Sequence, residues 1–348
     1  HIIKVMSSSL ISDEDITAWY RDGAVKLTSV FNEEQLKQIR EAYDWSIANP
    51  SNIGMTLFGS DNYYNDAASL TGKNADKIKA KILPYVVDSP LPEIAQRLFH
   101  GNSVYYYDHE IFTKRYGNKT KPRRKSTTPF QEGGKKPKRK HEEGGKEGRS
   151  DSPFHQDTGY IGIMGQFAGF WISFEDIPQQ NCLEIVKGSH RGPMYDGTPF
   201  VGGRVSKFYS PKPINDILSL TFYSYTLQEN DTKSMYGNDP NIVDYVLPRL
   251  PDVHKYKAQG KLDVLSWNLK KGDVVCFNPH SLHGNAGTDN DFQERNTIVF
   301  RFFSDKAYYK KLPPKRRSRW TRHLNSGDYY YKTNHFTKVA ESTQKSRL

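Results

Sequence analysis

A histidine and an aspartate two positions apart, His155 and Asp157, form the pair in this sequence best suited to bind a metal ion. Side chains at positions i and i+2 of a β-strand project from the same face, so this imidazole and carboxylate can reach one cation. Composition predicts roughly one His-X-acid pair by chance, and the chain has two. The other, His141 and Glu143, lies in a Lys/Gly/Glu-rich tract without strand periodicity, which favours a solvated loop. His155 and Asp157 are therefore the candidate ligands.

A third ligand has to come from a histidine far along the chain. His280 and His283 both follow the apolar, strand-like run DVVCFN. We prefer His283 because it opens a glycine-rich turn, which lets the backbone approach a ligand closely. His280 is interpreted as a residue beside the site or on the surface. A facial triad of two imidazoles and one carboxylate on a metal ion needs this second histidine from a distant strand.

Two arginines on the strand after this turn offer a partner for a carboxylate. In a hairpin, Arg295 would return beside the end of the strand that presents His283. A guanidinium there can bind the far carboxylate of a dicarboxylate whose near end chelates the metal. Arg301 shares the face of Arg295 but lies roughly 20 Å further along the strand, so both cannot bind one small ligand. For either arginine, a surface salt bridge is the alternative.

The surrounding segments predict a mainly β protein with flanking helices. Ser12 and Asn32 are good N-caps for two early helices, and the second of these has an apolar stripe that should pack against a sheet. Two further short helices are expected at about 75–86 and 91–99. Runs rich in β-formers and bounded by turn residues predict strands over 103–116, 166–177, 182–190, 265–284 and 296–305.

The domain organisation follows from where these patterns change. We expect one domain over 6–348, with N-terminal helices over about 12–100 and a β core over about 103–305. A low-complexity basic tract, 119–150, predicts a mobile insertion between two strands. The long irregular part after the predicted strands around position 190, with aromatic residues between 195 and 225, predicts a functional cover. The tail 306–348 is basic and aromatic and has no pattern that assigns a firm structure.

The net charge of +11 is unevenly distributed. The tract 119–150 carries 12 Lys/Arg against 4 Glu, so the rest of the chain is close to neutral and nucleic acid is not a favoured partner. No apolar run is long enough for a membrane span, and Cys182 and Cys276 suit free buried thiols in a reducing, intracellular compartment. The C-terminal Ser346-Arg347-Leu348 resembles a peroxisomal address. A peroxisomal location is one expectation, and a cytoplasmic location is the other.

Four motifs occur in a recognisable order: FHQD followed by a tyrosine, a strand containing Trp171, NCLEIVKGSHRG, and KKGDVVCFNPHSLHG followed by a strand that opens with Arg295. In order and spacing they resemble the phytanoyl-CoA dioxygenase superfamily of Fe(II)- and 2-oxoglutarate-dependent oxygenases. This resemblance implies a double-stranded β-helix, the cupin-like jelly-roll. The N-terminal DITAWYRDGAVKLTSVFNEEQLKQIREAYD resembles the entry region of the family. Lys187 stands where the family commonly has proline, and the basic tract is foreign to its usual pattern.

The resemblance assigns the iron ligands to His155, Asp157 and His283. It places Arg295 on 2-oxoglutarate, and Asn285 at a position that can contact this cosubstrate. Trp171 matches an aromatic residue near the site, with core packing as an equal alternative. Fe(II), 2-oxoglutarate and O2 are the implied cofactors and cosubstrates, and the reaction yields succinate and CO2. Hydroxylation of a small-molecule or acyl-CoA-like substrate is the default outcome, and desaturation, epoxidation or rearrangement would use the same residues. The aspartate ligand argues against halogenation.

Two other functions are compatible with the sequence. A metal-dependent, cupin-like enzyme that does not use 2-oxoglutarate would make Arg295 dispensable. A degenerate oxygenase scaffold could instead bind a polyanion through the basic tract 119–150. The complete ligand set and the absence of aromatic residues interleaved with the charges weigh against this second alternative. The sequence predicts no particular oligomeric state.

Overall fold

The structure, a computed structural model, describes residues 10–49, 75–115, 154–195, 250–285, 287–312 and 317–343. The predicted basic insertion, most of the predicted aromatic cover and the C-terminal tripeptide therefore lie outside the described residues. Within the described ranges, no helix is long and apolar enough to cross a bilayer.

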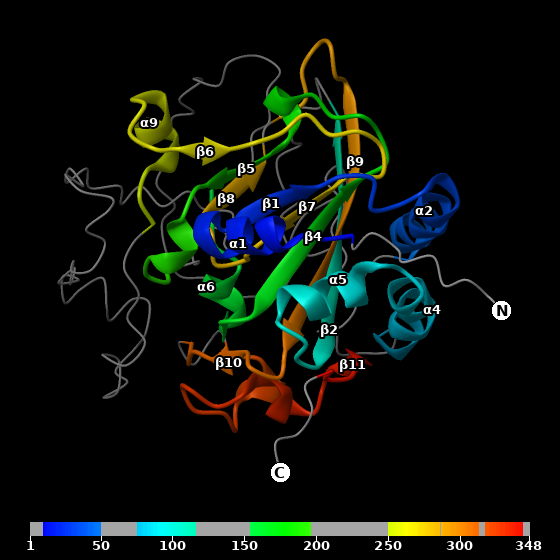
Figure 1. The fold of residues 1–348 in the computed structure, drawn as a ribbon, viewed down its shortest axis with the longest axis vertical. Helices are drawn as coiled ribbons and strands as arrows, with labels where there is room; N and C mark the ends of the chain where they lie inside the picture. Colours follow the sequence, from blue (N-terminus) through cyan, green and yellow to red (C-terminus); the bar gives the residue numbers. More distant parts are fainter. Residues whose placement is uncertain are drawn as a thin grey trace, which may run out of the picture.

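A six-stranded antiparallel sheet forms the larger wall of the β core, in the order β1-β7-β4-β9-β2-β11. The two longest strands, β9 and β2, pair with each other and run to the right of the centre in Figure 1. Strand β4 is buried along its whole length, as a strand covered on both faces must be. The bounds of the strands are Ala24–Leu27 (β1), Val274–Phe277 (β7), Phe167–Ser173 (β4), Glu294–Ser304 (β9), Val104–Arg115 (β2) and Thr337–Ala340 (β11).

A smaller antiparallel sheet, in the order β6-β5-β8, packs against the inner face of the large one. Its strands are Val264–Leu265 (β6), Leu183–Val186 (β5) and His283–Asn285 (β8). Apolar side chains from both sheets, among them Trp171, Ile185 and Val299, fill the space between them. Burying the inner faces of two sheets against each other is what stabilises a sandwich of this kind. The predicted mainly β, jelly-roll class is confirmed.

The outer face of the large sheet is covered by helices, on the side away from the small sheet (Figure 1). The first two helices, α1 and α2, begin at the predicted caps: Ser12 and Asn32 each accept a hydrogen bond from the backbone N–H three residues later. Gly23 ends α1 in the left-handed conformation that favours glycine. The helix bounds are Asp13–Asp22 (α1), Glu33–Ala48 (α2), Ala75–Val87 (α4), Leu91–Leu98 (α5), Thr158–Ile161 (α6) and Val253–Ala258 (α9).

A β-bulge in β2 decides which side chains of that strand face the interior. The pairing of β2 with β9 runs in register up to Tyr106, skips Tyr107 and resumes with Asp108 opposite Arg301. A bulge shifts the alternation of side chains by one residue. Asp108 and Glu110 consequently point into the core between the sheets, whereas His109 points outward toward the helices.

The C-terminal part, for which the sequence assigns no firm structure, is ordered against the β core. Strand β10 (Tyr308–Tyr309) pairs with β3 (Ile163–Met164), and β11 adds to the edge of β2. Tyr330 is fully buried in an aromatic cluster with Tyr107 and Phe303. The pairing of β11 with β2 and the contact of Tyr330 with Tyr107 link residues more than 200 positions apart in the chain, which short-range sequence patterns do not reveal.

His109 is a buried histidine away from the candidate metal site, and it makes stability depend on pH. Its Nε2 lies 2.9 Å from Ser46 Oγ and its Nδ1 lies 3.1 Å from the Tyr106 hydroxyl. Burial, with the nearby Arg301 charge, lowers the pKa of His109 from 6.5 to about 3. Between these values the unfolded chain binds a proton that the folded protein does not. The free energy of unfolding therefore decreases as the pH falls through this window.

We expect His109 to cost the protein about 2 kcal/mol of stability on acidification from pH 7.5 to pH 5, at about 1.4 kcal/mol per unit below pH 6.5. The change His109→Gln should reduce this loss by about that amount, because glutamine does not titrate. Urea unfolding at both pH values measures the difference. His254→Gln, at an exposed position, is the control and should keep the wild-type loss. Equal losses in wild type and His109→Gln would show that His109 is not the group responsible.

Candidate metal centre

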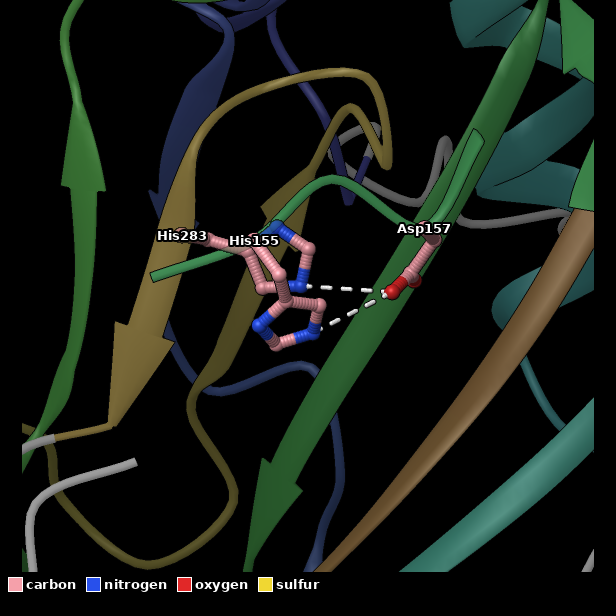
Figure 2. Close-up of side chains that lie close together, drawn as sticks. All are labelled: His155, Asp157 and His283. Atoms are coloured by element: carbon pink, nitrogen blue, oxygen red, sulfur yellow. Dashed lines mark ion pairs between the residues drawn. The ribbon is translucent and has the colours of Figure 1, made fainter. Parts of the chain in front are cut away.

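His155, Asp157 and His283 meet at one point between the two sheets (Figure 2). Their potential ligand atoms all lie within 4.8 Å of one another. Asp157 Oδ1 is 3.4 Å from His155 Nε2 and 3.6 Å from His283 Nε2. Asp157 is fully buried and His283 nearly so, whereas the His155 side chain keeps 13% of its surface exposed. The three donors thus face one small volume, and His155 is the ligand with the most exposed side chain.

The backbone around the first two ligands differs from the predicted strand. His155 forms an isolated bridge with His283, and Asp157 has α-helical dihedral angles at the start of α6. The expectation that both ligands project from one regular strand is therefore wrong. The two ligands converge because helix α6 begins directly after the bridge. The helical backbone at Asp157 places its carboxylate next to the two imidazoles.

Backbone hydrogen bonds hold the two ligand-bearing segments together. His155 and His283 exchange both possible N–H···O bonds, each 2.9 Å long, and the Asp157 N–H donates to the Pro279 carbonyl at 2.9 Å. The buried Gln156 side chain, which points away from the metal-facing side chains on either side of it, adds a bond from Nε2 to the His280 carbonyl at 2.7 Å. The distance between the ligands is therefore set by the fold before any cation binds.

The hydrogen bonds of His283 define its tautomer. Its Nδ1 lies 2.9 Å from the Ser281 carbonyl, which can only accept, so Nδ1 carries the proton. The Nε2 lone pair consequently faces Asp157 and is available to a metal. Burial, with the neighbouring His155, lowers the pKa of His283 to about 4. The imidazole is therefore neutral at physiological pH, as a ligand must be.

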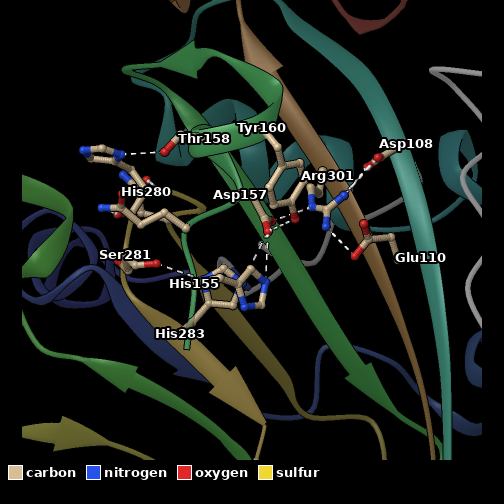
Figure 3. A network of polar contacts seen from close by, with 12 residues as sticks. Asp108, Glu110, His155, Asp157, Thr158, Tyr160, His280, Ser281, His283 and Arg301 are labelled. Carbon is tan, nitrogen blue, oxygen red and sulfur yellow. Dashed lines mark hydrogen bonds and ion pairs between the residues drawn. The ribbon is translucent and has the colours of Figure 1, made fainter. Parts of the chain in front are cut away.

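Three kinds of side chain contact the Asp157 carboxylate: a guanidinium, two imidazoles and a tyrosine hydroxyl. Burial opposes its ionisation, but the Arg301 guanidinium and the two imidazoles outweigh this effect and keep the pKa of Asp157 well below its ordinary value. Arg301 Nε lies 3.0 Å from Asp157 Oδ2, in an ion pair whose N–H is not aligned for a hydrogen bond. The Tyr160 hydroxyl donates to Oδ1 (Figure 3). Burial and the Asp157 charge raise the pKa of Tyr160 well above its ordinary value, so its proton is retained.

His280 lies next to the centre without joining it. Its Nε2 lies 3.1 Å from the Gly192 carbonyl, which makes Nε2 the protonated nitrogen, and its Nδ1 accepts from the Thr158 hydroxyl at 2.6 Å. Both ring nitrogens are therefore engaged away from Asp157. Burial lowers the pKa of His280 to about 4, so the ring is neutral. This geometry supports His283 over His280 as the third ligand. His280 instead connects the segment of Thr158 with the segment of Gly192.

Arg295 lies on β9, buried among residues of both sheets. Its guanidinium carbon is 5.6 Å from the centre of the Trp171 ring, and Nη1 donates to the Asn181 carbonyl. The predicted hairpin between the strands of His283 and Arg295 is wrong: β8 pairs with β5 in the small sheet, and β9 pairs with β4 and β2 in the large one. In a jelly-roll, consecutive strands cross between the sheets, so the two residues lie on different walls of the β core.

Polar atoms buried near Arg295 are suited to a ligand. Thr297 Oγ1, on the face of β9 that Arg295 and Arg301 share, and Trp171 Nε1 are both buried and have no hydrogen-bond partner among the described residues. Buried polar groups normally have partners, and a bound polar molecule is one way to provide them. Trp171 is 1% exposed and contributes to the core as well. Asn285 is placed only by its backbone, opposite Leu183 in the small sheet.

The sequence patterns predict no role for three neighbours of the site: Asp108, Glu110 and Tyr160, which is the tyrosine that follows FHQD. Arg301 is predicted from the sequence to bind a ligand or to lie in a surface salt bridge, whereas the structure buries it against Asp108, Glu110 and Asp157. The available signal was weak. Two carboxylates at i and i+2 in an aromatic strand, together with an arginine inside an apolar strand, indicate charges that must pair in the interior.

We expect Gln156→Ala to loosen the connection between the ligand-bearing segments. Gln156 is 2% exposed, and its side chain bonds the carbonyls of Pro193 and His280 and the Tyr195 N–H. Leaving these groups unpaired should lower the free energy of unfolding by about 2 kcal/mol or more and weaken binding of a divalent metal about tenfold. Thermal unfolding and Co(II) titration measure the two effects. The exposed Gln259→Ala is the control, and unchanged Co(II) affinity in Gln156→Ala would contradict this prediction.

A jelly-roll that brings two histidines and one aspartate together defines the class of the non-haem iron oxygenases. A sequence model of the phytanoyl-CoA dioxygenase family matches residues 19–295, so the chain belongs to this family. Its members are Fe(II)- and 2-oxoglutarate-dependent oxygenases, and the chain is accordingly an oxidoreductase that uses iron, 2-oxoglutarate and O2. A search of curated protein sequences found no match to the chain.

Solved structures with the same architecture include two enzymes of nogalamycin biosynthesis. The non-haem α-ketoglutarate-dependent epimerase SnoN aligns over 94% of this chain and 98% of its own, with 13% identity and a TM-score of 0.50. The non-haem α-ketoglutarate-dependent carbocyclase SnoK aligns over 92% of this chain and 93% of its own, with 15% identity and a TM-score of 0.50. At these identities the similarity establishes the shared fold.

Proposed function

We propose that this protein hydroxylates a small-molecule or acyl substrate, with iron held by His155, Asp157 and His283 and 2-oxoglutarate anchored by Arg295. The observation that carries the proposal is the convergence of the three donor atoms within 4.8 Å. The His283 tautomer and the ionised state of Asp157 fit a divalent cation, because both donors present lone pairs and the carboxylate is negative.

We place the proposed cosubstrate site on the face of β9 that points into the core between the two sheets. Arg295, Thr297 and Arg301 lie on this face at intervals of two or four residues. Arg301 is engaged by Asp108, Glu110 and Asp157, which leaves Arg295 as the guanidinium for a dicarboxylate. Thr297 Oγ1 and Trp171 Nε1 contribute buried polar atoms without a hydrogen-bond partner among the described residues. A bound carboxylate would accept hydrogen bonds from these donors.

The residues of the chain have separate tasks in this proposal. The bound iron and 2-oxoglutarate supply oxidative decarboxylation, in which one oxygen atom of O2 enters succinate and the other enters the substrate. His155, Asp157 and His283 would hold the iron, whose chemistry requires positions left free for the cosubstrate and O2. Arg295 orients the cosubstrate through its far carboxylate, and the apolar cluster around Trp171 and Val299 excludes water from the reaction.

A mass-spectrometric assay with ¹⁸O₂ tests this proposal. Purified protein with Fe(II), ascorbate and 2-oxoglutarate is incubated with panels of small apolar molecules and acyl-CoA thioesters, and succinate and oxidised product are quantified. Hydroxylation predicts one ¹⁸O atom in succinate and product mass increased by one oxygen atom. Product with two hydrogens fewer, or with unchanged mass, would replace hydroxylation by desaturation or rearrangement. Substrate oxidation without any need for 2-oxoglutarate would contradict the proposed use of Arg295.

A further inference from the structure

We infer that Arg301 is a positioning residue of the metal centre: its contact with Asp157 reserves one carboxylate oxygen for the metal, and Asp108 and Glu110 hold the guanidinium in place. This inference rests on the proposed function, since it concerns how the proposed aspartate ligand is oriented. Arg301 was expected at most to bind a ligand or to lie in a surface salt bridge, and its described contacts fit neither role.

Arg301 is almost completely buried, with 2% of its surface exposed. Its Nη1 donates to both oxygens of Asp108, at 3.0 and 2.9 Å, and its Nη2 pairs with Glu110. Its Nε lies 3.0 Å from Asp157 Oδ2. A planar guanidinium is rigid, so anchoring two of its nitrogens on β2 fixes where its charge lies beside Asp157 Oδ2, in an ion pair whose N–H is not aligned for a hydrogen bond. Figure 3 shows the side chain between the two carboxylates of β2 and Asp157.

The two oxygens of Asp157 thereby have different surroundings. Oδ2 faces Arg301, whereas Oδ1 faces both imidazoles and also accepts from the Tyr160 hydroxyl. A carboxylate whose second oxygen is engaged in this way would bind a metal through one oxygen only. Binding through one oxygen keeps three of six octahedral positions open, which a chelating cosubstrate and O2 together require. Binding through both oxygens would occupy one of these positions.

The fold provides this arrangement through the bulge at Tyr107. Asp108 lies directly opposite Arg301 in the pairing of β2 with β9, and Glu110 follows on the same face. If β2 paired with β9 without this bulge, Tyr107 would lie opposite Arg301, and the alternation of side chains would turn both carboxylates toward the helices. Groups that orient a metal ligand typically contribute 10- to 100-fold to metal affinity, so a specific arrangement of this kind has a measurable effect.

The test is Co(II) binding to the full chain, followed by the visible absorption of the metal, with Arg301→Lys as the main variant. Lysine keeps the positive charge but replaces the fork with one amine, which cannot contact all three carboxylates. We expect Co(II) to bind at least about tenfold more weakly. We also expect its absorption band to change in position and intensity, because the coordination of the carboxylate changes. Arg97→Lys, in an exposed ion pair with Asp13, is the matched control and should behave as wild type.

A second variant, Asp108→Asn, decides the question if Arg301→Lys fails to fold. Asparagine has the same shape, and it weakens the anchor of Nη1 while Arg301 and Asp157 stay in place. We expect a loss of affinity of about threefold or more and a change of the Co(II) band in the same direction.

If wild type binds no Co(II), or binds it equally after Asp157→Ala, the proposed function fails. If binding needs Asp157 but the folded variants match wild type in affinity and spectrum, the role of Arg301 is overturned and the proposed function stands.

Discussion

Asp157→Ala is expected to reduce the affinity for Fe(II) more than about 100-fold and to abolish succinate formation. Residues that only orient a ligand contribute 10- to 100-fold, so removing a charged ligand should exceed that range. The two remaining imidazoles do not form a facial triad, and the only negative charge among the three donors is lost. Equilibrium dialysis of Fe(II) under anaerobic conditions, with iron quantified in both chambers, measures the change.

The variant should still fold, which makes its loss of metal interpretable. Arg301 keeps Asp108 and Glu110 as partners after Asp157 is removed, so no buried charge is left unpaired. Asp176→Ala removes an exposed aspartate that is paired with Lys270 at 2.8 Å, and it serves as the matched control. Iron affinity in Asp157→Ala within a few-fold of the control would show that Asp157 is not a ligand.

Arg295→Ala is expected to weaken 2-oxoglutarate binding about 30-fold or more while leaving iron affinity unchanged. Truncating one partner of a buried, hydrogen-bonded charge pair costs about 2 to 5 kcal/mol, and 2 kcal/mol corresponds to roughly 30-fold in the dissociation constant. The metal ligands lie on other segments of the chain, so they should keep their geometry. Isothermal titration of 2-oxoglutarate into the anaerobic Fe(II) protein measures this difference.

Two controls separate the role of Arg295 from a general effect of losing an arginine. Arg40→Ala, on the exposed face of α2 in an ion pair with Asp44, should bind 2-oxoglutarate like wild type. Succinate, which keeps the far carboxylate but lacks the keto acid, should be affected by Arg295→Ala in the same direction as 2-oxoglutarate. Unchanged affinity for 2-oxoglutarate in Arg295→Ala would favour the alternative of a cupin-like enzyme that does not use this cosubstrate.

Local patterns in the sequence were sufficient for much of the fold. The helix caps at Ser12 and Asn32 and the glycine stop at Gly23 are interactions within a few residues, so the sequence alone reveals them. The strand-rich runs gave the mainly β class for the same reason. The sequence indicates the proposed ligands because His155 and Asp157 are two positions apart and His283 precedes a recognisable turn. Each of these signals depends on spacing rather than on three-dimensional pairing.

The contacts that were missed depend on pairing between distant strands. Asp108 and Arg301 are separated by 193 positions in the chain. Their pairing depends on a β-bulge, and no glycine, proline or other turn residue in the sequence indicates that bulge. The hairpin expected for Arg295 failed because the order of strands in the two sheets differs from their order in the chain. The backbone at Asp157 departed from the strand pattern because α6 begins there, a change that the short motif does not encode. Sequence spacing therefore identified the candidate ligands but not the groups that orient them.

The most direct test of the central claim is an anaerobic titration of the apo-protein with Fe(II) and then 2-oxoglutarate, followed by visible absorption. Chelation of Fe(II) by the keto acid gives a metal-to-ligand charge-transfer band. We expect a band that saturates at one equivalent of iron, disappears in Asp157→Ala and requires a higher 2-oxoglutarate concentration in Arg295→Ala. Iron bound without any such band, or a band of equal strength in all three proteins, would contradict the proposed site.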